Sequence, residues 1–117
     1  MDRVIELGRL LDYYGGFLTE RRLRFARAYA DENLSLGEIA EAEGISRQAV
    51  RDGIVSAEKQ LREMEEKLHL IERSDRVTGL IRAAEKRAED LPPGEDRAEI
   101  LRLLKLAVQR MEEDDGI

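Results

Sequence analysis

The stretch LSLGEIAEAEGISRQAV, Leu34–Val50, carries the signals that decide the fold. Glu38 follows Ser35 by three positions, which is the spacing of a capping box: the serine oxygen and the glutamate each accept a backbone N–H at the helix start. Gly44 suits the left-handed conformation that ends a helix, and Ser46 suits the cap of the next one. The stretch therefore predicts two helices joined by a short glycine turn, which is a helix-turn-helix unit.

Small and branched apolar residues in this stretch agree with that geometry. Ala40 is small at the point where the second helix crosses the first, and Ile39, Ile45, Ala49 and Val50 can fill the wedge between the two helices. The same pattern would also suit an ordinary helical hairpin inside a bundle, so this alternative stays open.

Two further helices are expected on the N-terminal side. Apolar residues recur every three or four positions from Val4 to Tyr14, which predicts an amphipathic helix over residues 3–14 that Gly15 and Gly16 end. Thr19 is placed to cap a second helix over residues 20–31.

On the C-terminal side, an apolar seam predicts one long helix over residues 47–73, roughly 40 Å in length. The seam alternates spacings of four and three, as in a coiled coil. Either other helices of the same chain cover it, or the chain forms a parallel homodimer through it. The residues expected in such a homodimer are Val50, Ile54, Leu61, Met64 and Leu68.

The expected fold is all-α, with a helix-turn-helix domain over residues 1–73 and a helical C-terminal extension over residues 74–117. Within the extension, LPPGED separates two amphipathic helices, and Asp96 with Glu99 suggests a second capping box. The terminal EEDDGI is expected to be an acidic, frayed end.

Composition excludes several kinds of chemistry. The chain of 117 residues contains no cysteine and one histidine, so thiolate nucleophiles, disulfides and Cys- or His-based metal sets are not expected. It lacks a glycine-rich phosphate loop. We therefore expect no enzyme, no cofactor and no metal. The charged N-terminus and the absence of a membrane-length apolar run favour a cytoplasmic protein with no membrane partner.

A nucleic-acid surface would have to be local, because the net charge is −6 and neither half of the chain is basic. The start of the fourth helix is the main candidate: Ser46, Arg47, Gln48 and Arg51 suit phosphates and base edges, although the neighbouring Asp52 would repel a phosphate. Arg21 and Arg22, with Arg24 and Arg27, form a second basic cluster. This cluster could either face a polyanion or pair with Glu20, Asp31 and Glu32.

Three segments, DYYGGFLTERR, LSLGEIAEAEGISRQAV and EKLHL, resemble the YlxM family of bacterial signal-recognition-particle-associated proteins. The central segment also resembles the fourth region of sigma factors, whose helix-turn-helix reads promoter DNA. Arg51 and Gly53 depart from the YlxM pattern.

The YlxM resemblance implies a non-enzymatic nucleic-acid-binding accessory or regulatory protein of the signal recognition particle pathway. Its partners would be RNA or DNA, in particular the particle's RNA, and the particle's GTPases. The alternatives are a protein-interaction module that docks on those GTPases and a sigma-like DNA-binding transcription regulator.

Overall fold

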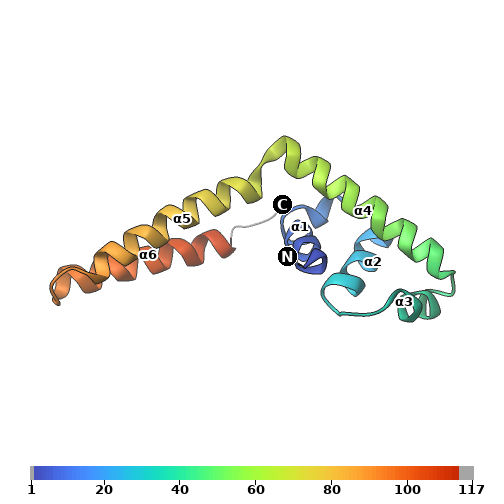
Figure 1. The fold of residues 1–117 in the computed structure, drawn as a ribbon, viewed down its shortest axis with the longest axis horizontal. Coiled ribbons are helices and arrows are strands. Elements are labelled where there is room, and N and C mark those ends of the chain that lie inside the picture. The colour runs from blue at the N-terminus through green and yellow to red at the C-terminus, as the bar shows by residue number, and fades with distance from the viewer. Residues whose placement is uncertain (1, 114–117) are drawn as a thin grey trace. The chain divides into compact units, whose positions relative to one another are not determined.

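The computed structural model describes residues 2–113, and all regular elements in this range are helices (Figure 1). The chain divides into two compact units, the first ending at His69 and the second beginning at Leu70. The all-α expectation is confirmed. Of the expected acidic end, residues 114–117 lie outside the described range. Within that range, no helix is both long and apolar enough to cross a membrane.

The first unit contains four α-helices, and the last three start at the cap residues predicted from the sequence, whereas the first is capped by Asp2. Ser35 and Glu38 form the complete capping box, with N···O distances of 3.1 and 3.0 Å. Gly44 has φ 69° and ends the third helix, and Ser46 accepts the N–H of Ala49 at 3.0 Å. The helices are α1 (Arg3–Tyr14), α2 (Glu20–Ala30), α3 (Leu36–Glu43) and α4 (Arg47–Leu68), with a short 3-10 helix η1 (Gly15–Phe17) after α1.

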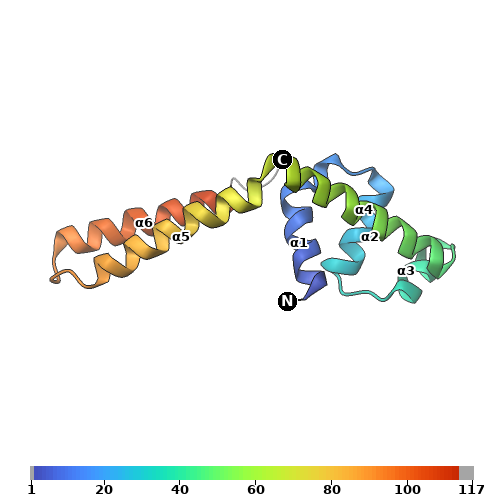
Figure 2. The same ribbon diagram turned by 45° about the horizontal axis from the view of Figure 1, so that its top comes forward.

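The core of this unit lies where α4 packs against α1, α2 and α3 (Figure 2). Its largest fully buried side chains include Tyr14, Phe25 and Leu61. The apolar seam of α4 is therefore used within the chain over most of its length.

This arrangement corrects the expected homodimer through the α4 seam. Val50, Ile54 and Leu61 are buried in the single chain, with at most 5% of each residue exposed. Met64 is half-buried, and only Leu68 is exposed. Because α1 and α2 occupy the seam, a second copy cannot pack against it without unfolding the first unit.

The long helix expected over residues 47–73 ends earlier. His69 has φ 56°, in the left-handed region, and its N–H donates to the Glu65 carbonyl oxygen at 2.8 Å. This conformation ends α4 at Leu68.

The second unit consists of two antiparallel helices, α5 (Leu70–Glu89) and α6 (Glu95–Glu113), which lie side by side (Figures 1 and 2). The LPPGED segment separates the two helices, as expected: residues 91–94 lie in the turn, and α6 begins at Glu95. The second capping box is wrong, because Asp96 lies inside the first turn of α6 and Glu99 pairs with Arg102 at 2.6 Å.

Candidate nucleic-acid interface

The first turn of α4 combines two features that favour anions. It contains no acidic residue, and its free backbone N–H groups carry the positive end of the helix dipole. The Ser46 hydroxyl oxygen accepts from Ala49, so this side chain acts as the cap; its own O–H can still donate to a ligand.

The Arg47 side chain folds back over the start of α3. A Cβ atom placed on Gly37 would lie 3.1 Å from the Arg47 Cζ, so the guanidinium rests closely against the bare backbone at residue 37. The turn between α3 and α4 brings Gly37 and Arg47 into contact, although they are ten positions apart in the sequence. No local sequence signal could have shown this contact, and the sequence reading missed Gly37.

Gln48 is exposed and donates from Nε2 to the Asp52 carboxylate at 2.8 Å. This bond occupies one oxygen of the carboxylate that would repel a phosphate. The Gln48 amide still has its oxygen and one N–H available for a ligand.

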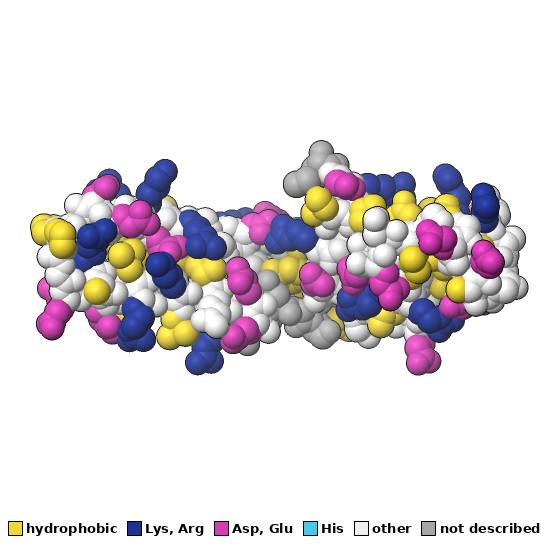
Figure 3. All heavy atoms as spheres, turned by 90° about the horizontal axis from the view of Figure 1, so that it is seen from below, with side chains coloured by type: hydrophobic (Ala, Val, Ile, Leu, Met, Phe, Trp, Pro, Cys, Tyr) yellow, Lys and Arg dark blue, Asp and Glu magenta, His cyan; other side chains and the backbone are white. Residues whose placement is uncertain are grey.

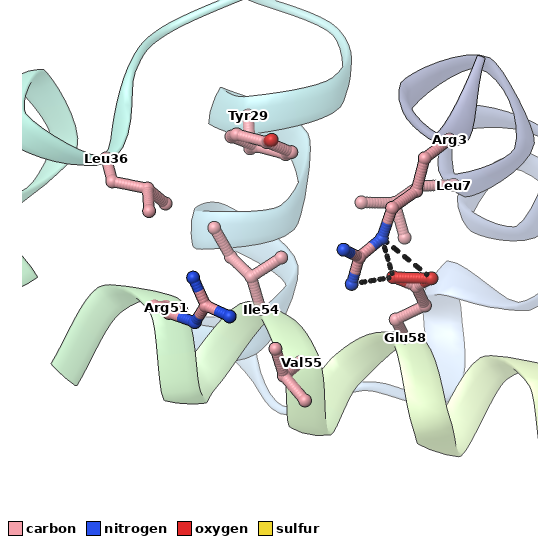
Figure 4. A pocket seen from close by; sticks show the side chains of 8 residues that line it. All are labelled: Arg3, Leu7, Tyr29, Leu36, Arg51, Ile54, Val55 and Glu58. Carbon is pink, nitrogen blue, oxygen red and sulfur yellow. Dashed lines mark hydrogen bonds and ion pairs between the residues drawn. The ribbon is translucent and has the colours of Figure 1, made fainter. Parts of the chain in front are cut away.

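Arg51 lies at the edge of a small pocket between α1, α2, α3 and α4 (Figure 4). In this view it is directed toward Leu36 and Tyr29, while Arg3 reaches Glu58 from the other side. The pocket volume is about 70 Å³, which is room for roughly two water molecules. It is too small for a nucleotide base, so any nucleic acid would contact the rim of the pocket and not its interior.

An ion-pair network fixes the far side of this pocket. Glu58 is buried and accepts from Arg3 of α1 at 3.0 Å and from Arg62 at 3.2 Å; Arg62 also reaches Glu6 at 3.1 Å. Burial alone would raise the pKa of Glu58, but the hydrogen bonds and charges of the two arginines outweigh burial and lower it. The network joins α1 to α4, the helix that carries Arg51.

The arginines of α2 are mostly engaged within the chain. Arg27 pairs with Asp31 at 2.9 Å, which agrees with the second of the two alternatives stated above. Arg24 forms two hydrogen bonds with the Glu43 carboxylate, and this pair lowers the pKa of that carboxyl. Arg22 donates to Gln60 at 3.0 Å, and the Arg21 guanidinium lies 5.2 Å from the centre of the Phe25 ring.

The two basic groups are therefore apart: one is at the start of α4, and Arg22 of the other, on α2, contacts α4 much further along. Gln60, the partner of Arg22, is nine positions beyond Arg51, which is about 13 Å along the helix axis. Arg3, Arg24, Arg27 and Arg62 each pair with a carboxylate. Arg47 and Arg51 have no carboxylate partner among residues 2–113. In the face that Figure 3 shows, basic and acidic side chains alternate and no extended basic area is visible.

Comparison with known proteins assigns this arrangement to a family. The profile described as "Putative helix-turn-helix protein, YlxM / p13 like", UPF0122, matches residues 1–100. The chain belongs to the UPF0122 family. This assignment confirms the resemblance to YlxM.

Several UPF0122 proteins are similar to this chain. That of Desulforamulus reducens is 50% identical over 66 residues, which span 56% of either chain. That of Halalkalibacterium halodurans is 39% identical over 92 residues, 75% of this chain and 84% of the relative. That of Symbiobacterium thermophilum is 38% identical over 100 residues, 86% and 87% of the two chains. No solved structure matches.

Membership of this UPF0122 helix-turn-helix family indicates a nucleic-acid-binding regulator with a non-enzymatic fold. Ser46, Arg47, Gln48 and Arg51 lie together at the start of α4, while Arg21 and Arg22 lie on α2. Their roles as ligand contacts stay predictions.

Proposed function

We propose that this UPF0122 protein is a non-enzymatic regulator that binds nucleic acid with the first two turns of α4. The observation that carries the proposal is the exposure of Arg47 and Arg51 without a carboxylate partner in the described chain. Phosphates can therefore bind to both guanidinium groups without breaking an ion pair of the protein. Gln48, between them, offers an amide suited to base edges.

The acidic chain limits how strong this binding can be. Each phosphate neutralised contributes roughly −0.9 to the slope of log affinity against log salt on duplex DNA, so two arginines give a slope of about −2. A much steeper slope would mean that Arg21 and Arg22 also bind phosphates. Arg22 would then have to leave Gln60.

Titration of labelled duplex DNA and structured RNA with the full chain, at about 50 mM salt, tests the proposal. We expect saturable binding that Arg47→Glu combined with Arg51→Glu abolishes. Lys105→Glu with Arg110→Glu is the matched control: it makes the same change in net charge on exposed residues of α6 and should leave binding unchanged.

A second variant separates folding from binding. Ser46→Asp keeps a good helix cap but adds a negative charge at the proposed surface, so helicity by circular dichroism should hold while affinity falls. Absence of saturable binding by the wild-type protein to either nucleic acid would refute the proposal.

We place this protein in the cytoplasm as an accessory of the signal recognition particle, with the particle's RNA as ligand. The resemblance of DYYGGFLTERR and EKLHL to YlxM supports this placement. Affinity capture of the full chain from a bacterial lysate tests it. Particle RNA recovered with the wild type and lost with the Arg47→Glu, Arg51→Glu variant supports the placement, and recovery of no particle component contradicts it.

One observation favours a second function, docking on the particle's GTPases. Val55 is 45% exposed on α4 and, with Arg51, lines the pocket, so this surface is partly apolar. GTPase capture that survives nuclease treatment and is lost with Val55→Glu would support docking. A third possibility, a sigma-like transcription regulator, would require protection of promoter DNA in a footprint.

A further inference from the structure

The α5–α6 hairpin, formed by Leu70–Glu89 and Glu95–Glu113, leaves many large apolar side chains exposed. Leu80 is 69% exposed and Leu103 is 50% exposed, and Figure 3 shows hydrophobic side chains at the hairpin surface. In contrast, the described residues of this unit include only three buried ones, Glu85, Ala88 and Val108. Two helices of this kind have little core of their own.

Six apolar residues of α5 and α6, most of them exposed, share one face of the hairpin, whereas the exposed Leu106 lies on the opposite side of α6. In each helix, every one of them directly precedes a residue of the α5–α6 contact, as Ala84 precedes the buried Glu85 and Ala107 precedes the buried Val108. One position is a rotation of about 100°. Because the two helices are antiparallel and face each other, this rotation places the preceding residues of both helices on the same side of the hairpin. We call this the hairpin face: Val77, Leu80, Ala84, Ile100, Leu103 and Ala107.

We propose that a second copy of this chain covers the hairpin face, so that two hairpins form a four-helix bundle. The face is about 30 Å long, from the length of α5, and roughly 20 Å wide for two helices. The flat area is therefore roughly 600 Å². Because protruding side chains make the accessible surface larger than the flat area, the buried area approaches the ~800 Å² per partner of a stable interface. The surface is separate from the seam of α4.

Two arrangements with a two-fold axis can bring the hairpin faces of two copies together. Arg87 lies near the end of α5, level with the first turns of α6, where Asp96 and Glu99 lie. A two-fold axis along the helices sets α5 of one copy over α6 of the other and brings Arg87 toward these carboxylates. The other two-fold arrangement, α5 over α5, brings Arg87 toward Arg73 and Arg76. Arg110, near the end of α6 and on the same side of the hairpin, has the reverse preference: it meets Arg73 and Arg76 in the first arrangement and Asp96 and Glu99 in the second. These charges therefore do not choose between the two arrangements. Each arrangement has a two-fold axis, so either contact closes as a dimer.

Sedimentation equilibrium of the full chain, over a range of concentrations, tests the proposal. We expect a dimer of two 13.4 kDa chains for the wild type. Leu80→Glu and Leu103→Glu should each raise the dimer dissociation constant by more than about 100-fold, because the two-fold axis repeats each lost contact. Circular dichroism should show an unchanged helix content, since both side chains are exposed in the single chain.

Leu106→Glu is the control, because Leu106 lies on α6 opposite its contact with α5 and outside the hairpin face. It should leave the dimer intact. A wild-type protein that is monomeric at all concentrations would overturn the proposal, and so would a dimer that survives both face substitutions. Equal loss of the dimer with Leu106→Glu would also overturn it, because association would then not depend on the face.

Discussion

Gly53 lies inside α4, where a glycine is unfavourable, and packing explains its presence. Glycine in a helix interior costs roughly 1 kcal/mol relative to alanine. A Cβ at this position would lie 3.0 Å from Cδ2 of Phe25, whose ring is buried. The ring has little room to move, because Phe25 is buried, with only 2% of the residue exposed. Gly53 is therefore required for the close approach of α2 to α4.

We predict that Gly53→Ala lowers the free energy of unfolding by about 1 kcal/mol, because the strain against Phe25 exceeds the gain in helix propensity. Gly79→Ala in α5 is the matched control. No atom lies within 4 Å of its added Cβ, so it should raise the free energy by about 0.5–1 kcal/mol. Urea denaturation measures both. Equal stabilisation by the two substitutions would show that the Phe25 ring can yield.

At the residue scale, the sequence predicted what depends on near neighbours. Thr19, Ser35, Gly44 and Ser46 all cap helices, because capping joins residues two or three positions apart. The contact of Arg47 with Gly37 and the closeness of Gly53 to Phe25 depend on how helices cross, and no short spacing encodes them.

At the scale of elements, the starts of the first four helices followed from the sequence, but the end of α4 did not. The apolar spacing continues through Leu68 to Ile71, so periodicity alone extends the helix to residue 73. One residue, His69, ends it by its backbone conformation. Periodicity shows which face of α4 is apolar; it does not show that α1 and α2 cover that face.

The contact between α1 and α4 should depend on pH through Glu58. The lowered pKa of this carboxyl means that the folded chain binds fewer protons than the unfolded chain below about pH 4.3. Its stabilising effect is therefore present above that pH and is lost as pH falls through the folded pKa. Arg3 and Arg62 would then have lost their shared partner.

We predict that Glu58→Gln lowers the free energy of unfolding by about 1 kcal/mol at pH 6. The difference from wild type should shrink at a second, lower pH, because Glu58 becomes protonated in both states as the pH falls through its folded pKa. Urea denaturation at the two pH values measures it, and Glu99→Gln is the control. Glu99 also pairs directly with an arginine, Arg102, but it is exposed and lies on α6. A difference that does not shrink as the pH is lowered would contradict this assignment.

At the scale of the whole molecule, the family match over residues 1–100 includes the whole first unit and α5. Arg47 and Arg51 are a small basic group in a chain of net charge −6. This combination favours a weak, local contact with nucleic acid over a broad electrostatic one. The sequence predicted the residues at the start of α4, whereas the in-chain pairing of Arg24 with Glu43 became visible only in the fold.

The most direct test of the central claim is an amide NMR titration of the full chain with the nucleic acid that it binds at low salt. Binding through the helix-turn-helix predicts the largest shift changes at residues 46–55, with smaller ones around Gly37, where Arg47 rests. The α5–α6 hairpin should change little. Shift changes confined to α5 and α6, or absent at residues 46–55 while binding is saturated, would contradict the account.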